Sequence, residues 1–280
     1  MRRVVIVVSL AVLCVSGSCA RRPGPSAAMP LVVDVDARDY VFSMPAPDTV
    51  PAGPVTFRLV NRGHEIHMMQ AVWLGERALP EFVASVAAAT TNSSIVGTRS
   101  LGGPNAVVPG DTAEATVVLE PGHVALVCWV MGEDGKLHVL KGMAVPLEVT
   151  PAAGLGPAEP AADAVVTLRD YAIELSGDLA PGRHMFRVEN HGPSEHDVEL
   201  FRMEPGATLD DIDAWMRHPG QGSPRARPMG GMVGLDAGRH GTFTARLRPG
   251  DYLLACLVPD PDGALHYRAH GMLRRFHVGI

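Results

Sequence analysis

The sequence predicts an all-β protein made of two tandem Greek-key β-sandwiches, each with a short helical insertion. Three observations support this expectation: a turn-rich composition, an internal duplication and a series of short strand-like runs in each copy. Glycine (30) and proline (24) are abundant among the 280 residues, whereas aromatic residues make up only 5%. With 46% hydrophobic and 19% charged residues, the chain can bury a core. This composition favours many short strands joined by turns over a helix bundle.

The first twenty residues predict a bacterial export signal. Arg2 and Arg3 precede an apolar run at 4–15, and small residues follow at 16–20. The run is too short to span a bilayer comfortably, and no later segment approaches the roughly 20 apolar residues that spanning requires. We therefore expect the protein in the periplasm or at the cell-envelope surface, with no transmembrane span after the signal.

Two outcomes are open at the end of this signal. The stretch from Ser16 to Cys19 resembles a bacterial lipobox, in which Cys19 becomes a lipid anchor, although Ser16 stands where a large aliphatic residue is usual. Ordinary cleavage after Ala20 fits as well. Residues 21–30, which are rich in proline, alanine and arginine, then predict a flexible tether.

The remaining chain contains a tandem duplication. The tripeptide Arg-Asp-Tyr at 38–40 returns at 169–171, which is 131 positions later. Further features return at offsets of 128 or 129: Asn61 as Asn190, Gly102-Gly103 as Gly230-Gly231, Pro121-Gly122 as Pro249-Gly250, and Asp134-Gly135 as Asp262-Gly263. Residues 151–163, rich in proline, alanine and glycine, predict a linker between a first repeat at 31–150 and a second repeat at 164–280.

Alternating or β-branched runs predict six strands in each repeat. In the first repeat they are 31–36, 55–61, 68–74, 113–119, 124–130 and 143–149, and in the second 165–175, 184–190, 197–203, 242–247, 252–258 and 272–278. A helix is expected at the same place in each copy, at 79–89 and at 209–216, with Thr208 as the N-cap of the latter. Several short strands in about 120 residues indicate a Greek-key sandwich.

Each repeat also carries one set of residues suited to a soft metal ion. Beyond the signal the chain retains only two cysteines, one per repeat, and each ends a hydrophobic strand. The sets are His67, Cys128, His138 and Met143 in the first repeat, and His196, Cys256, His266 and Met272 in the second. Two imidazoles, a thiolate and a weak axial thioether are the ligands of a mononuclear blue-copper site, so the pattern predicts one copper ion per repeat.

The segments around these residues resemble the cupredoxin family. The run from Pro249 to Cys256, followed by a turn, a histidine and a methionine, looks like the C-terminal half of a cupredoxin domain. The run from Asn190 to Asp197 resembles the segment that brings in the first histidine ligand. The resemblance covers nearly the whole mature chain in two copies. It implies cupredoxin-like sandwiches whose type-1-like copper sites exchange electrons with a redox protein partner.

The sequence departs from the family pattern in three ways. Nine residues separate each cysteine from its downstream histidine, which is longer than in small blue-copper proteins and nearer to the blue site of copper nitrite reductases. Val124 stands where the second repeat has Tyr252, the family-typical aromatic residue. In the second repeat five residues, rather than four, separate the histidine from the methionine, and His270 enters as a rival ligand.

A metal-free alternative stays open. A cysteine at the end of a core strand is usually a small buried hydrophobe, and a Cys128–Cys256 disulfide is a further option in an oxidising compartment. The protein would then be a cupredoxin-fold interaction or structural module. Met229 and Met232, which flank a glycine pair, are expected in a flexible loop, and His64 is expected on the surface.

Enzyme and nucleic-acid functions are disfavoured by what the sequence lacks. Val127 and Ala255 precede the cysteines, where multicopper oxidases and copper nitrite reductases call for histidine, and the sequence contains no His-x-His pair. Motifs typical of hydrolases, zinc proteases and phosphate-binding loops are also absent. The net charge of −6 comes with no basic block, which argues against nucleic acid as a partner. The sequence therefore predicts an exported copper-binding electron carrier.

Overall fold

The computed structural model describes residues 29–45, 48–89, 97–153, 157–217 and 225–279. The expected signal at 1–20, nearly all of the tether and part of the linker lie outside these residues. Among the described residues, no helix is both long and apolar enough to cross a membrane.

Within the described residues, strands dominate both repeats. The elements of the first repeat are β1 (Leu31–Arg38), β2 (Val41–Ser43), β3 (Thr49–Pro51), β4 (Gly53–Asn61), β5 (Gln70–Gly75), α1 (Leu79–Ala88), β6 (Arg99–Gly102), β7 (Thr112–Leu119), β8 (Gly122–Val127), the 3-10 helix η1 (His138–Lys141) and β9 (Ala144–Thr150). Those of the second are β10 (Ala164–Arg169), β11 (Ala172–Ser176), β12 (Gly182–Asn190), β13 (His196–Met203), α2 (Leu209–Arg217), β14 (Ala226–Leu235), β15 (His240–Leu247), β16 (Gly250–Ala255), α3 (His266–Ala269) and β17 (Leu273–Val278).

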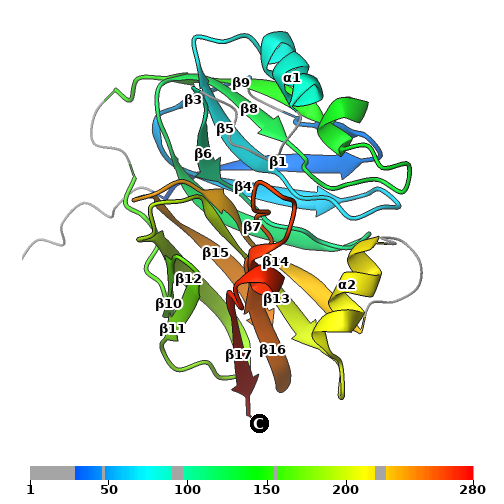
Figure 1. Cartoon of the computed structure of the whole chain (residues 1–280). Helices are drawn as coiled ribbons and strands as arrows, with labels where there is room; N and C mark the ends of the chain where they lie inside the picture. The colour runs from blue at the N-terminus through cyan, green and yellow to red at the C-terminus, as the bar shows by residue number, and fades with distance from the viewer. Residues whose placement is uncertain (1–28, 46–47, 90–96, 154–156, 218–224, 280) are drawn as a thin grey trace, which may run out of the picture.

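The strands form two sheets, and each sheet runs through both repeats (Figure 1). One sheet has the order β11-β10-β12-β15-β7-β4-β1-β2, and the other has the order β17-β16-β13-β14-β6-β5-β8-β9-β3. Alternate side chains of facing strands fill an apolar core that both sheets share. The expectation of an all-β protein with sandwich-like layers is confirmed.

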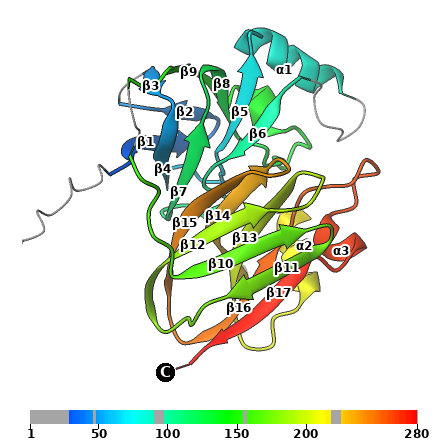
Figure 2. The same ribbon diagram turned by 90° about the vertical axis from the view of Figure 1, so that its left-hand side faces the viewer.

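The two repeats meet edge to edge (Figure 2). β15 pairs antiparallel with β7, which places Gly241 opposite Val117, and β14 pairs with β6 at Leu235 and Leu101. Glycine is needed at 241 because a Cβ atom there would lie 2.7 Å from the carbonyl oxygen of Thr116. The sheets therefore continue from one repeat into the other, and the two repeats are joined by strand pairing as well as by the linker.

Two parts of the second repeat differ from the sequence expectation. The expected strand at 165–175 is broken at Tyr171, which has a positive φ of 55°, and becomes the hairpin of β10 and β11. The glycine-rich segment at 226–235 is a strand, β14, and not a flexible loop, and Met232 within it is fully buried. A Cβ atom on Gly231 would lie 2.0 Å from the carbonyl oxygen of Val198, so glycine allows β14 to approach β13.

The helical insertions lie where the sequence predicts them. α2 begins at a capping box, in which Thr208 Oγ1 accepts a hydrogen bond from the Asp211 backbone N–H and Asp211 Oδ2 accepts one from the Thr208 backbone N–H. α1 buries Phe82 and Val86 in a small second core together with residues of β5 and β8.

Candidate metal centres

In the first repeat, three of the predicted ligands converge from three elements. His67 lies just before β5, Cys128 directly after β8, and His138 at the start of η1. The Cys128 Sγ atom is 4.0 Å from His67 Nδ1 and 3.5 Å from His138 Nδ1, and the two Nδ1 atoms are 3.2 Å apart. All three side chains are fully buried. The fold therefore assembles one sulfur and two nitrogen donors in a closed space.

The second repeat assembles the equivalent group. His196 begins β13, Cys256 follows β16, and His266 begins α3. The Cys256 Sγ atom lies 3.8 Å from His196 Nδ1 and 3.5 Å from His266 Nδ1. All three side chains are buried. Among the described residues, these two His-Cys-His triplets are the groups whose potential metal-binding atoms all lie within 4.8 Å of one another.

The size of the first triplet fits a transition-metal ion. In a trigonal plane with bonds of about 2.0 Å to nitrogen and about 2.3 Å to sulfur, the nitrogens lie about 3.5 Å apart and the sulfur about 3.8 Å from each nitrogen. The observed separations in the first repeat, 3.2, 3.5 and 4.0 Å, fall around these values. An ion can therefore enter with donor shifts of a few tenths of an ångström.

The predicted methionines lie beside the cysteines in backbone register. The Cys128 backbone N–H donates to the Met143 carbonyl at 3.2 Å, and the Met143 N–H donates to the His138 carbonyl at 3.0 Å. The same two hydrogen bonds in the second repeat, at 3.1 and 3.3 Å, place Met272 in the equivalent position. Both methionine side chains are fully buried in the same apolar cluster as the cysteines. Their role as axial ligands stays a prediction.

A carboxylate holds the outer nitrogen of each upstream histidine. His67 Nε2 donates to Asp39 Oδ1 at 2.8 Å, and His196 Nε2 donates to Asp170 Oδ1 at 2.7 Å. This hydrogen bond selects the tautomer whose Nδ1 lone pair faces the cysteine. Although burial works against it, hydrogen bonds from the His64 backbone and from His67 hold the pKa of Asp39 at about 2.

Sequence reasoning missed the function of these two aspartates. Asp39 and Asp170 belong to the duplicated Arg-Asp-Tyr tripeptide, which the sequence analysis used only as a marker of the duplication. The signal that could have identified them is the return of an acidic residue in both copies, next to a turn. Metal-bound histidines commonly donate their second N–H to a carboxylate.

The downstream histidines also have acidic partners, but from different places in the two repeats. His138 Nε2 donates to Glu65 Oε2 at 2.9 Å, and Glu65 lies two residues before the upstream histidine. His266 Nε2 lies 3.4 Å from Asp260 Oδ1, and Asp260 belongs to the loop after the cysteine. The two centres therefore have the same kinds of donor atom and differ in the acidic partner of the downstream histidine.

The structure places His270 outside the second triplet. Its Nε2 donates to Asp260 Oδ2 at 2.7 Å, and its ring stacks on Tyr171 with centroids 3.7 Å apart. The rings of His270 and His266 have centroids 5.8 Å apart. His270 therefore lies against Asp260 and Tyr171. It contacts the ring of His266 and does not take the place of His266 beside Cys256.

A repeated asparagine shapes the loop before each upstream histidine. Asn61 Nδ2 donates to the carbonyls of Glu65 and Val107 at 2.8 Å, and its Oδ1 accepts from the Gly63 N–H at 2.9 Å. Three equivalent hydrogen bonds surround Asn190. Because both side chains are buried and fully used, they fix the path of the chain into each centre.

The electrostatics of both centres favour neutral donors in the absence of a metal ion. Burial lowers the pKa of His67, His138 and His266 below the usual value for histidine. Burial also raises the pKa of the Cys128 thiol to about 12 and that of the Cys256 thiol well above its usual value. The imidazoles are therefore ready to bind, whereas each thiol must lose a proton when a metal ion enters.

Two smaller expectations are settled by these contacts. Cys128 and Cys256 are both free and buried, so the alternative of a Cys128–Cys256 disulfide is wrong. His64 is exposed over 97% of its side chain, as expected for a surface residue, and donates to Asp39.

Known proteins similar to this chain include blue-copper proteins. Auracyanin A, a blue copper protein from Chloroflexus aurantiacus, is 20% identical and matches 44% of this chain and 100% of its own, with a TM-score of 0.32. The blue copper oxidase of Nitrosomonas europaea is 15% identical and matches 89% of this chain and 86% of its own, with a TM-score of 0.27. A copper-containing nitrite reductase from Thermus scotoductus is 13% identical and matches 89% of this chain and 61% of its own, with a TM-score of 0.25.

Sequence comparison alone assigns no family. No protein-family model matches the chain. A curated 3-phosphoshikimate 1-carboxyvinyltransferase from Bacillus velezensis is 35% identical over 115 residues, which are 38% of this chain and 27% of that enzyme. The chain spans only about a quarter of the length of that relative.

Proposed function

We propose that the protein is an exported copper-binding electron carrier with one type-1-like site in each repeat. The observation that supports this most is the pair of buried triplets. In each, the thiol sulfur lies 3.5–4.0 Å from the Nδ1 atoms of two imidazoles. In this proposal Met143 and Met272 are the weak axial ligands. A His₂Cys plane with a distant methionine is the donor set of blue-copper electron-transfer sites.

The surroundings of the donors suit rapid electron exchange. Copper would supply the one-electron change, and the protein would keep the donors in place during it. Asp39 and Asp170 fix the upstream imidazoles, and backbone hydrogen bonds fix each cysteine–methionine pair. A buried and hydrogen-bonded donor set moves little when the charge of the ion changes, which keeps the reorganisation small.

A tyrosine ring packs against the downstream histidine of each centre. The ring of Tyr40 packs edge-on against His138 with centroids 4.8 Å apart, and that of Tyr171 packs edge-on against His266 at 5.3 Å. Tyr171 is 39% exposed. We infer that a redox protein partner approaches over these tyrosines, so that the copper stays shielded from water while electrons cross a short distance.

The absence of histidine directly before either cysteine supports a carrier over an enzyme. Val127 and Ala255 occupy those positions. We further propose that the mature protein acts in the periplasm or at the cell-envelope surface, with Cys19 as its lipid anchor. Fractionation of cells that express Cys19→Ala tests the anchor: release from the membrane fraction is expected, and an unchanged membrane-bound fraction contradicts it.

A copper titration followed by visible absorption tests the central proposal. Copper-free protein should bind two equivalents of Cu(II) and develop the intense colour of thiolate-to-copper charge transfer. Cys128→Ser and Cys256→Ser should each remove one equivalent of colour, and the double variant should remove all of it. His277→Gln, which changes an exposed histidine on β17 that pairs with Asp251, serves as the matched control and should leave the titration unchanged.

Failure of this experiment would favour the other function class. If the parent protein takes up no copper, or if colour persists in the double variant, the chain is not a blue-copper carrier. The fold would then act without metal, as an interaction module with two buried cysteines.

A further inference from the structure

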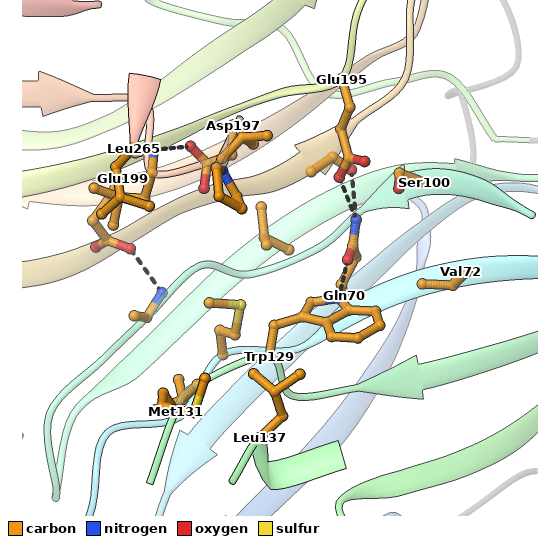
Figure 3. Close-up of a pocket in the computed structure, with 18 of the residues that line it drawn as sticks. Gln70, Val72, Ser100, Trp129, Met131, Leu137, Glu195, Asp197, Glu199 and Leu265 are labelled. Atoms are coloured by element: carbon orange, nitrogen blue, oxygen red, sulfur yellow. Dashed lines mark hydrogen bonds between the residues drawn. The ribbon is translucent and has the colours of Figure 1, made fainter. Parts of the chain in front are cut away.

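A cavity of about 670 Å³ is lined by residues of both repeats and lies next to both metal centres (Figure 3). Each of the six residues of the two His-Cys-His triplets has a sequence neighbour that lines the cavity. These neighbours include Met68, Trp129 and Leu137 from the first repeat, and Asp197, Leu257 and Leu265 from the second. The volume is in the range of sites that hold small organic ligands.

Two opposite walls of the cavity come from equivalent segments of the duplication. Ile66, Met68 and Gln70 of the first repeat correspond, at an offset of 129, to Glu195, Asp197 and Glu199 of the second. Because successive side chains of a strand point to opposite faces, residues two apart line the same side. One wall is therefore apolar or neutral, and its counterpart carries three carboxyl groups.

Glu199 is the clearest sign that a ligand belongs here. Its side chain is fully buried, and its Oε2 accepts a hydrogen bond from the Ala106 N–H at 2.9 Å. Its Oε1 is buried and has no hydrogen-bond partner among the described residues, and Glu199 is one of the residues that line the cavity (Figure 3). A buried carboxyl oxygen without a partner is costly, and the equivalent Gln70 shows that the fold does not require an acid at this position.

The other two carboxyl groups already have neutral protein donors, which include the Ser100 side chain for Glu195 and the Val258 N–H and Cys256 thiol for Asp197. Glu195 Oε1 accepts from Gln70 Nε2 at 3.2 Å. Asp197 Oδ1 accepts from the Leu257 N–H at 2.6 Å, and its Oδ2 lies 3.4 Å from Asn105 Nδ2. Among the described residues that line the cavity there is no lysine, arginine or histidine. Within the described part of the cavity lining, the acidic wall thus has no cationic partner.

The spacing of the three acids indicates an extended ligand rather than a single metal ion. Asp197 and Glu199 are two apart on β13, so their Cα atoms are separated by about 6.7 Å, and Glu195 lies one residue before that strand. In agreement, these acids are not among the described groups whose ligand atoms all come within 4.8 Å of one another. A chain with several positive groups, linked by apolar spacers, matches this row better.

We propose that the cavity binds a linear aliphatic diamine or polyamine. Its ammonium groups pair with Glu199 and with one or both of the other wall acids, since an extended four-carbon spacer separates two nitrogens by about the distance between alternate residues of a strand. Its methylene groups lie on the opposite wall, against Ile66 and Met68. The indole of Trp129, which donates its N–H to Gln70, adds an aromatic surface beside the cationic groups.

Calorimetric titration of the full-length, copper-free protein tests this proposal independently of copper binding. The probes are 1,4-diaminobutane and spermidine, with 1-aminobutane and 1,4-butanediol as controls of equal length. The diamine and spermidine should bind with one molecule per protein, the monoamine should bind about tenfold more weakly or worse, and the diol should not bind. Glu199→Gln should weaken diamine binding about tenfold, whereas Glu174→Gln, which changes an exposed acid on β11, should not.

Several results would overturn it. They are no binding of either amine, equal binding of the diol, competition by equimolar Mg²⁺, or unchanged diamine binding in Glu199→Gln. Near-ultraviolet circular dichroism verifies that Glu199→Gln is folded, and Glu195→Gln is measured in parallel because that side chain is half-buried and its loss perturbs the core less. If both folded variants bind the diamine like the parent, the acidic wall is not its site.

Discussion

Replacing Asp39 by alanine should weaken copper binding at the first centre, because this carboxylate holds His67 and also accepts hydrogen bonds from the backbone N–H groups of His64 and Glu65. Asp39 Oδ1 accepts the only hydrogen bond found for His67 Nε2 among the described residues, at 2.8 Å, and His67 is fully buried. Without this acceptor, a buried N–H is left unpaired at a cost of about 1–3 kcal/mol. The imidazole also loses the contact that fixes its tautomer, and loss of such a partner typically lowers metal affinity about 10–100-fold.

The assay is a competition between the protein and a copper chelator in a Cys256→Ser background, which leaves only the first centre able to form its thiolate bond. Asp36→Ala is the matched control. Asp36 is an acid on β1, three residues before Asp39, and it pairs with Arg62 at the surface. Copper affinity should fall about 10–100-fold in Asp39→Ala and stay within twofold in the control. An Asp39→Ala protein that is folded and binds copper as tightly as its parent would refute the role assigned to this carboxylate.

Four further predictions follow from the same geometry. Because burial raises the pKa of both thiols, each copper ion should displace about one proton, and affinity should rise about tenfold per pH unit near neutrality; calorimetry in buffers of different ionisation enthalpy measures this, and no proton release would contradict it. The two centres should have different visible spectra when isolated as Cys128→Ser and Cys256→Ser, since the downstream histidines differ in their acidic partners; superimposable spectra would remove that link. Burial raises the pKa of Glu199 well above 4.5, so the folded protein keeps a proton that the unfolded chain releases. The stability that this group contributes below about pH 4.5 is therefore lost as the pH rises toward the folded-state pKa. In urea unfolding between about pH 4 and 8, the ligand-free parent protein should lose stability relative to Glu199→Gln, and parallel pH profiles of the two proteins would contradict this. Gly231→Ala should lower the free energy of unfolding by on the order of 3 kcal/mol because its Cβ would meet a carbonyl oxygen at 2.0 Å, whereas Gly279→Ala, with open space around it, should have no effect.

The sequence was most informative where the duplication repeated a chemical pattern. The return of His, Cys and His in the same order predicted two triplets, and the structure brings both together from strands and loops far apart in the chain. Period-two alternation predicted most of the long strands. It could not indicate β2 and β3, because three residues at a sheet edge are too few for a pattern.

Other features depend on contacts that no local pattern encodes. The strand β14 contains the pair Gly230-Gly231, and glycines inside a strand look like a loop until the neighbouring backbone that needs them is known. Along β13, acids alternate with apolar residues, which is the pattern of a strand with one face in solvent. The first repeat covers that face, so Glu199 becomes buried. Only the edge-to-edge pairing of the repeats reveals this cavity.

Anomalous diffraction at the copper absorption edge, from crystals of copper-loaded protein, tests the central claim most directly. Two strong peaks are predicted per chain, one bonded to His67 Nδ1, Cys128 Sγ and His138 Nδ1, and the other to the equivalent atoms of the second repeat. A thioether sulfur should lie at a longer distance on one side of each plane. A single peak, or copper bound at the carboxylates of the cavity instead of at the triplets, would contradict the account.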